Sequence, residues 1–385
     1  MKVVIVCDSF KESLSALDVA DAIEDGFREI YPDANYVKLP AADGGEGTAE
    51  ALVLATGGRM LTCPVTGPQG ESVTASIGLL GNGRTAVVEM AAAAGLALVA
   101  PDQRDPTTAT TYGVGQLIQA ALNEGYRHII LGLGGSATND AGAGMAQALG
   151  VELRDENGQS LPFGGNALSR LAEIDRSRLD PRLATCQIEV ACDVDNPLTG
   201  PSGASAIFGP QKGATAEMVL QLDEALSVFA RHIETQTGQK VDTLPGTGAA
   251  GGLGAGALAF LGATLRPGVD IIMDALKLDA VLEDADLVIT GEGRMDGQTI
   301  RGKAPIGVAR VAKRHGRPVI AIAGSLGADV NAVHEHGIDA VFSVVNRPCS
   351  LGDALTEAAA NIRITARNIA ATISCCSARP VQTLN

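Results

Sequence analysis

The amino-acid sequence predicts an α/β protein with a doubly wound, mostly parallel six-stranded Rossmann-like sheet and a second, smaller mixed α/β domain inserted in two pieces. Short, continuously apolar runs alternate with segments of helical periodicity, which is typical of parallel strands buried on both faces. Two intervening regions instead show period-two alternation and turn-rich segments. The 385 residues also exceed what one hydrophobic core usually fills, which favours two domains.

Six apolar runs are expected to be the strands of the parallel sheet. They are residues 3–6, 36–39, 129–131, 287–290, 319–323 and 340–345. Ser15 and Asp18 have the spacing of a capping box, so a helix should begin after the loop that follows the first strand. The Rossmann-like domain is therefore expected to consist of residues 1–60, 108–150 and 268–385.

The remaining residues, 61–107 and 151–267, are expected to form the inserted mixed domain. Apolar and small polar residues alternate along residues 73–79, which indicates a half-exposed strand, and residues 84–90 should be its partner in an antiparallel insertion. An apolar stripe at helical spacing over residues 219–233 predicts an amphipathic helix. We expect the active site in the cleft between the two domains, because such a cleft can close and exclude water.

The composition argues against several classes of function. A formal net charge of -15 disfavours general nucleic-acid binding and anionic membranes. Seven scattered cysteines, without a C-x-x-C pair, favour a reducing cytosol over a disulfide framework or a structural zinc site. No stretch approaches about 18 apolar residues, so no membrane span is expected. These properties fit a cytoplasmic protein that acts on small molecules.

The glycine loop, residues 132–142, follows an apolar run and precedes a small-residue segment that should begin a helix. Asp140 can cap that helix by accepting hydrogen bonds from its free N–H groups. Gly142 and Gly144 would each weaken a helix by roughly 1 kcal/mol relative to Ala, which makes sense where a ligand or another backbone lies close. Because a helix N-terminus attracts anions, we expect this loop to face a phosphate.

Five strand ends carry polar or glycine-rich loops, and ligands bind at this end of open parallel sheets. The loops comprise residues 8–11, 43–46, 132–139, 291–296 and 324–325. The sequence contains no Walker A motif. Residues 132–137 match the relaxed dinucleotide pattern G-x-G-x-x-A, although no acidic residue clearly follows at the expected distance. An NAD-dependent oxidoreductase acting on a small hydroxy acid is therefore a second hypothesis.

Carboxylates and a lysine in the inserted region suit phosphoryl transfer. Asp193 and Asp195 follow an apolar run and could hold a divalent ion or supply a general base. Lys212 lies in a tight turn and is a candidate anion contact. Phosphoryl transfer needs positive charge on the moving group, Mg²⁺ held by carboxylates and a base that orients a hydroxyl. A kinase is the hypothesis that these residues favour, and a non-catalytic small-acid sensor is a third.

Six motifs together resemble the type 1 glycerate kinases of bacterial glyoxylate and sugar-acid metabolism. The motifs are Asp8-Ser9-Phe10-Lys11-Glu12-Ser13, Ala42-Asp43-Gly44-Gly45-Glu46-Gly47-Thr48, Gly134-Gly135-Ser136-Ala137-Thr138-Asn139-Asp140, Cys192-Asp193-Val194-Asp195-Asn196-Pro197-Leu198, Phe208-Gly209-Pro210-Gln211-Lys212-Gly213-Ala214 and Thr290-Gly291-Glu292-Gly293-Arg294-Met295-Asp296. Six long motifs in the right order are highly specific, and the likeness runs from Met1 to about Ala371. Two positions differ from the family pattern: Cys7 stands where Pro is expected, and Ala141 where Gly is expected.

The resemblance implies a bacterial glycerate 2-kinase, which phosphorylates D-glycerate to 2-phosphoglycerate with ATP and Mg²⁺. It also implies a Rossmann-like domain and a smaller α/β domain. D-glycerate and ATP are then the expected partners, without nucleic acid or membrane, and the chain could assemble as a homodimer.

Residue roles follow as our own hypothesis from this reaction and the side-chain chemistry. The expected catalytic residues are Asp193, as the base at the substrate hydroxyl, Lys11 and Arg294. The expected substrate contacts are Ser9, Lys212, Asp43 and Glu46. The expected nucleotide contacts are Gly134, Gly135, Ser136, Thr138 and Asn139. The candidates for Mg²⁺ are Asp195, Asp296 and Asp43.

Overall fold

The computed structural model describes residues 1–42, 44–45 and 47–377. The chain divides into two units: unit 1 is Met1–Asp43 with Ile272–Asn385, and unit 2 is Gly44–Ile271. Both contain parallel strands and helices, which confirms the α/β class. Among the described residues, no helix combines the length and the apolar character needed to cross a bilayer.

Unit 1 contains a five-stranded, fully parallel sheet in the order β13-β12-β11-β1-β2. Its strands are β1 (Lys2–Cys7), β2 (Asn35–Lys38), β11 (Leu287–Met295), β12 (Val319–Leu326) and β13 (Ala340–Ser343). The chain places β2 on one side of β1 and all later strands on the other, so the strand order reverses between β1 and β11. Such a reversal opens a crevice at the carboxyl ends of the two strands, where doubly wound proteins bind ligands.

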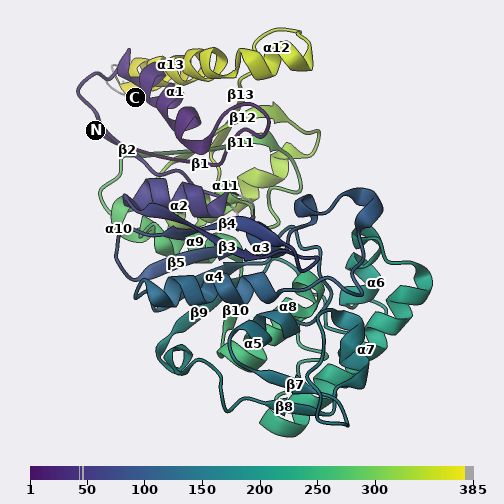
Figure 1. Ribbon diagram of the computed structural model, residues 1–385. Helices are drawn as coiled ribbons and strands as arrows, with labels where there is room; N and C mark the ends of the chain where they lie inside the picture. Colours follow the sequence, from purple (N-terminus) through teal and green to yellow (C-terminus); the bar gives the residue numbers. More distant parts are fainter. Residues whose placement is uncertain (43, 46, 378–385) are drawn as a thin grey trace. The chain divides into compact units, whose positions relative to one another are not determined.

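Helices cover both faces of this sheet (Figure 1). They are α1 (Ala16–Arg28), α10 (Leu278–Leu282), α11 (Ala304–Arg314), α12 (Leu351–Thr356) and α13 (Ala358–Ser377), with a 3-10 helix at Val330–His336. The predicted capping box begins α1, because the Asp18 N–H donates to Ser15 Oγ at 3.2 Å. Helices α1 and α13 pack on the same face, and Gly26 lets them touch, since a Cβ there would lie 2.3 Å from the Arg363 carbonyl oxygen.

Unit 2 contains a six-stranded mixed sheet in the order β10-β9-β6-β5-β4-β3. Its strands are β3 (Arg59–Thr66), β4 (Ser72–Leu79), β5 (Thr85–Glu89), β6 (His128–Gly132), β9 (Gln187–Ala191) and β10 (Thr264–Arg266). Strands β3, β4 and β5 pair antiparallel, which confirms the antiparallel insertion expected from the alternating residues. Strands β5, β6, β9 and β10 pair parallel, so one sheet joins both kinds of region.

The helices of unit 2 surround one large core. They are α2 (Thr48–Thr56), α3 (Ala91–Ala94), α4 (Tyr112–Asn123), α5 (Ala143–Ala148), α6 (Ala204–Phe208), α7 (Ala216–Thr237), α8 (Ala249–Leu261) and α9 (Gly268–Ala275), which runs past the end of the unit. Short 3-10 helices occupy Leu96–Leu98, Pro101–Gln103, Gly165–Arg170, Pro181–Thr185 and Pro210–Lys212. The predicted amphipathic helix is α7, whose Leu222, Leu226, Phe229 and Ile233 are buried.

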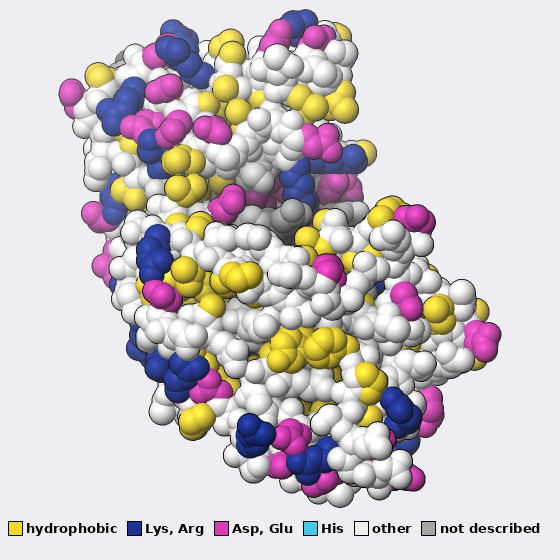
Figure 2. Space-filling view, viewed as in Figure 1, with side chains coloured by type: hydrophobic (Ala, Val, Ile, Leu, Met, Phe, Trp, Pro, Cys, Tyr) yellow, Lys and Arg dark blue, Asp and Glu magenta, His cyan; other side chains and the backbone are white. Residues whose placement is uncertain are grey.

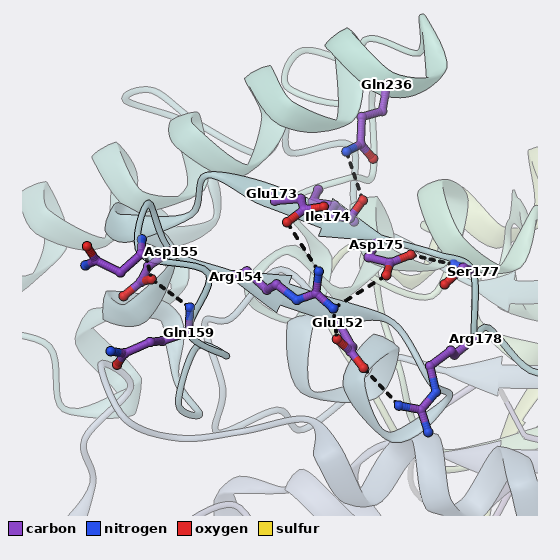
Figure 3. A network of polar contacts seen from close by, with 11 residues as sticks. Glu152, Arg154, Asp155, Gln159, Glu173, Ile174, Asp175, Ser177, Arg178 and Gln236 are labelled. Carbon is purple, nitrogen blue, oxygen red and sulfur yellow. Dashed lines mark hydrogen bonds and ion pairs between the residues drawn. The ribbon is translucent and has the colours of Figure 1, made fainter.

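A small two-stranded sheet, β7 (Glu152–Arg154) with β8 (Glu173–Asp175), is held by an ion-pair network at the surface of unit 2 (Figure 3). The Arg154 guanidinium contacts Glu152 and lies 3.4 Å from Glu173 and 3.6 Å from Asp175. Gln236 of α7 donates to the Ile174 carbonyl oxygen at 2.9 Å. Exposed pairs of this kind contribute about 1 kcal/mol or less each, so the network is best understood as a local anchor.

The expected six-stranded parallel sheet is wrong in one strand. Residues 128–132, as β6, pair with β5 and β9 in the sheet of unit 2 and not with β1 or β11. The division of the chain shifts accordingly, because residues 44–60 and 108–150 belong to unit 2. The reason is physical: any continuously apolar run suits a strand buried on both faces, and its pattern does not specify its neighbours.

Candidate active site

The loop after β1 forms a tight turn that presents Lys11. Phe10 and Leu14 exchange two backbone hydrogen bonds of 2.9 Å, and Lys11 is exposed between them. Glu12 has φ 65°, a left-handed conformation that costs a residue with a Cβ about 1–2 kcal/mol. Ser13 Oγ donates to the Leu355 carbonyl oxygen at 2.7 Å and so ties the turn to α12. Strain of this kind is common at functional sites.

The end of β11 lies beside this turn because two glycines let the backbones approach. A Cβ at Gly293 would lie 3.4 Å from Phe10 Cα, and a Cβ at Gly324 on β12 would lie 2.4 Å from the Gly293 carbonyl oxygen. Arg294 follows directly, with 71% of its side chain exposed and its Nε 3.0 Å from Asp296 Oδ2. The switch point of the sheet therefore carries Lys11 on one strand end and Arg294 on the next.

Glu292 is a buried carboxylate at the same strand end. Its Oε1 accepts from Thr299 Oγ1 at 2.6 Å, and its Oε2 accepts from Lys303 Nζ at 2.8 Å. Burial raises the pKa of Glu292, while Lys303 and Thr299 act in the opposite direction. Carboxylates with a perturbed pKa in a cavity are candidate functional groups. Here the ion pair with Lys303 holds the Glu292 side chain in place.

These residues line a cavity of about 630 Å³, which we call the switch pocket. One side is polar and is formed by Asp8, Ser9, Lys11, Glu12, Ser13, Glu292, Arg294, Lys303 and Ser325. The other side is mostly apolar and is formed by Val344, Val345, Leu351, Ala354, Leu355 and Ala358. The pocket brings together three of the expected site residues, Ser9, Lys11 and Arg294.

Sequence reasoning missed Glu292 and Lys303 as site residues. Glu292 stood within a quoted motif, but the strand was expected to end at residue 290, whereas β11 continues to Met295 and buries this side chain. Lys303 precedes Ala304-Pro305, and a proline in the first turn of a helix marks the preceding residue as a cap. That signal could have placed Lys303 at a helix start facing the strand ends.

Positive charge is scarce in this chain, which has 29 Lys and Arg against 44 Asp and Glu. On the face drawn in Figure 2, basic side chains lie among acidic ones. Lys11 and Arg294 meet at one pocket although they are 283 positions apart in sequence. Their convergence is therefore a property of the fold and makes this pocket a candidate site for an anion.

In unit 2, small residues gather at the carboxyl ends of β6 and β9 beside Asp193. Gly44 has φ 96°, and a Cβ there would lie 3.3 Å from Ala191 Cβ and 3.8 Å from Asp193 Oδ2. A Cβ at Gly132 would lie 3.2 Å from the Gly44 carbonyl oxygen. Asp193 is exposed, and its Oδ1 accepts from the Gly268 N–H at 2.9 Å. The glycines here allow close packing of the backbone next to a carboxylate that a backbone N–H holds in place.

The glycine loop turns most of its polar groups inward. Asp140 is fully buried and accepts from Thr111 N–H and Oγ1, both at 2.8 Å, from Gly142 N–H at 3.1 Å and from Gly144 N–H at 3.2 Å. Burial raises the pKa of Asp140, and these hydrogen bonds act against the rise. The expected capping by Asp140 is confirmed. Asp140 and Thr111 already accept from the N–H groups of Gly142, Gly144 and Met145, so these donors are not available to the phosphate expected at this helix start.

Lys212 is also directed inward. It is 1% exposed, and its Nζ donates to the Thr138 carbonyl oxygen at 2.6 Å. Burial lowers the pKa of Lys212 to about 7, and the nearby charge of Asp140 partly opposes this. The turn expected to offer an anion contact therefore places its lysine in the core of unit 2.

The other expected residues differ in accessibility. Gly134, Gly135 and Asp195 are exposed. Ser136 is 8% exposed, while Thr138 and Asn139 are fully buried, with Asn139 Nδ2 donating to Ser205 Oγ at 2.9 Å. Asp43 and Glu46 lie outside the described residues. Of the nucleotide contacts expected on the glycine loop, the two glycines present open backbone.

Within the described part of the chain, no three His, Cys, Asp or Glu side chains cluster as a metal site. Both Asp296 oxygens are engaged, Oδ2 with Arg294 and Oδ1 with the Gln298 N–H at 2.9 Å. Mg²⁺ commonly binds one or two carboxylates together with substrate phosphates. Exposed Asp195 is a donor of this chemical type, so the residues fit a metal that arrives with a phosphorylated ligand.

Comparison with known proteins identifies the family. The profile of the glycerate kinase family matches residues 3–374. The glycerate kinase of Bacillus subtilis (strain 168) is 57% identical over 373 residues, which are 97% of this chain and 98% of that protein. The glycerate 2-kinase of Escherichia coli (strain K12) is 57% identical over 374 residues, with the same coverage.

A solved structure agrees with the sequence comparisons. The crystal structure of a candidate glycerate kinase 2 from Salmonella typhimurium LT2 superposes with a TM-score of 0.91 at 60% identity, covering 98% of this chain and 99% of that one. These relatives lend no support to the oxidoreductase or sensor hypotheses. The chain belongs to the glycerate kinase family.

Proposed function

We propose that this protein transfers the terminal phosphoryl group of ATP to the 2-hydroxyl of D-glycerate, giving 2-phosphoglycerate and ADP. The observation that carries the proposal is the convergence of Lys11 and Arg294 at the switch pocket of a chain 57% identical to a glycerate 2-kinase. During transfer, the phosphoryl group is stabilised mainly by positive charge that is already in position. Two cations on neighbouring strand ends provide such charge.

Asp193 is our candidate for the base that accepts the proton of the substrate hydroxyl. It is exposed, and the Gly268 N–H donates to its Oδ1 at 2.9 Å, which helps to orient the carboxylate. A Cβ at Gly44 would lie within 4 Å of this carboxylate, so the segment that follows the expected substrate contact Asp43 lies beside the candidate base. Asp193→Asn keeps the size and loses the base, so turnover should fall by about 10²–10⁴-fold while the fold stays intact.

Mg²⁺, when bound, would neutralise charge on the nucleotide phosphates. Asp195, Asp296 and Asp43 are the candidate ligands, and Asp195 is the one whose exposed carboxylate most readily fits. Asp195→Asn should raise the Mg²⁺ concentration needed for half-maximal binding of ATP, measured by titration. An unchanged requirement would remove Asp195 from the candidates.

The function is tested by ADP release with and without D-glycerate, followed by phosphorus NMR of the product. The proposal predicts glycerate-dependent ADP and a phosphate on the 2-hydroxyl. A change in nicotinamide absorbance with glycerate and NAD would instead support the oxidoreductase hypothesis. Glycerate binding without ADP release would support the sensor, and a 3-phosphate product would overturn the proposed regiochemistry.

A further inference from the structure

The switch pocket is chemically two-sided. Its polar side is formed by the carboxyl ends of β1, β11 and β12 and carries Lys11 and Arg294. Its apolar side comes from Val344 after β13 and from Leu351, Ala354 and Leu355 of α12. Leu351 is 73% exposed, which is unusual for a leucine that lines a cavity. A ligand that fits must have one flat or apolar end and one anionic end.

The volume limits the choice of ligand. Cavities of roughly 300–1,000 Å³ hold ligands the size of a nucleotide or drug, and the pocket measures about 630 Å³. Glycerate, a three-carbon acid, would leave most of this space to water. It has no apolar group that could pack against the apolar side of the pocket. Of the two proposed substrates, only the nucleotide has a base for that wall and phosphates for the cations.

The charged residues that line the pocket give a third constraint on the ligand. Lys303 forms an ion pair with Glu292 at 2.8 Å, so the Glu292 carboxylate balances the positive charge of this lysine. Asp8 and Glu12 line the pocket together with Lys11 and Arg294. A rim with both signs of charge suits a triphosphate that carries a bound cation better than it suits a bare polyanion.

From these three constraints we propose that the switch pocket of unit 1 is the nucleotide site. The purine and ribose lie against Val344, Leu351 and Leu355, and the triphosphate extends towards Lys11 and Arg294. The inference rests on the proposed kinase function and assigns one of its substrates to one unit. It moves the nucleotide from the glycine loop, where the sequence had suggested it, to the point where the strand order reverses.

The test is an equilibrium titration of the full-length protein with ATP, by calorimetry, in the absence of glycerate. Leu351→Asp removes apolar wall and adds a negative charge, and Ala354→Trp fills the space that the base would occupy. Each should raise the Kd for ATP by about tenfold or more. The matched control is Leu220→Asp on α7, since Leu220 is also 73% exposed, and its Kd should stay within about twofold of the unmodified protein.

Steady-state kinetics separate this inference from the function on which it rests. The pocket variants should raise KM for ATP and leave KM for D-glycerate unchanged. If both variants remain folded by circular dichroism and bind ATP as the unmodified protein does, the assignment of the pocket is wrong, even where glycerate-dependent ADP release persists. If ATP binding weakens as expected but no variant or parent releases ADP with glycerate, the nucleotide site stands and the proposed function fails.

Discussion

The strand ends of unit 1 and the glycine loop of unit 2 contain similar kinds of residue but differ in how far these are exposed. Both combine glycines, hydroxyl side chains and a carboxylate, and both have a lysine close by: Lys11 in the first case and Lys212, from a separate turn, in the second. In unit 1, Lys11 and Arg294 are exposed at an open cavity. In unit 2, Asp140 and Lys212 are buried and bind the protein's own backbone. A glycine-rich loop after a strand is therefore no indication of a ligand until its polar groups are accounted for.

Sheet topology explains the difference. In unit 1 the strand order reverses between β1 and β11, so the connections leave in opposite directions and the strand ends separate. In unit 2 the strands cross the sheet in chain order from β3 to β10, without a reversal. A glycine in the glycine loop then serves close packing: a Cβ at Gly142 would lie 3.0 Å from Leu253 Cδ1 of α8.

The largest effect is expected at Asp140, because this buried carboxylate accepts four hydrogen bonds. Asp140→Ala leaves the buried N–H groups of Thr111, Gly142 and Gly144 without their acceptor and should lower the free energy of unfolding by roughly 3 kcal/mol or more. Asp155→Ala is the control, because Asp155 accepts from two backbone N–H groups in an exposed turn (Figure 3) and should cost about 1 kcal/mol or less. Urea denaturation measures the free energy of unfolding of both variants. Equal losses of stability would contradict the structural role of Asp140.

The second-largest effect is expected at Lys11, which is exposed at the strand ends of unit 1. Lys11→Met should reduce kcat by about 10²–10³-fold with little change in stability, because an exposed cation that stabilises the transferred phosphoryl group is removed. Lys313→Met removes another exposed lysine, which pairs with Asp339 on the surface, and should leave turnover unchanged. Normal turnover in Lys11→Met would refute the role of the switch pocket in catalysis.

The sequence predicted the elements better than their assembly. The parallel strands, the capping box at Ser15 and the stripe of α7 all follow from local periodicity and are confirmed. The sheet to which β6 belongs was missed, because an apolar run pairs equally well in either sheet. Lys11 and Arg294 were identified by chemical type, whereas the burial of Lys212 depends on the packing of the whole unit, which no local pattern records.

Lys212 gives a pH test of the inward-facing loop. In the unfolded chain its pKa is near 10.5, and burial lowers it to about 7 in the folded protein. Between these values the unfolded state binds more protons, so stability should rise with pH, with a slope of at most about 1.4 kcal/mol per pH unit. Unfolding at pH 7, 8 and 9 should show this rise in the parent and in Lys313→Met, and a flatter profile in Lys212→Met. A parallel profile in Lys212→Met would indicate that this lysine is solvated.

The smallest effect concerns Ala141, which stands where the family resemblance implies Gly. Its φ is 53°, a conformation that disfavours a Cβ. Ala141→Gly should therefore leave stability within about 0.5 kcal/mol, since relief of strain offsets the lost methyl group and the added chain entropy. The nearby Ala146→Gly, in the interior of α5, should lower stability by about 1 kcal/mol or more. Thermal denaturation of the two variants tests this order, and a larger loss in Ala141→Gly would reverse it.

Hydrogen–deuterium exchange of the full-length protein, with and without saturating ATP and Mg²⁺, most directly tests the contrast between the strand ends of unit 1 and the glycine loop of unit 2. We expect ATP to slow exchange in residues 8–14 and 351–358 and to leave residues 138–145 unchanged. Slowed exchange in residues 134–145, with residues 8–14 and 351–358 unaffected, would place the nucleotide on the glycine loop and contradict this account.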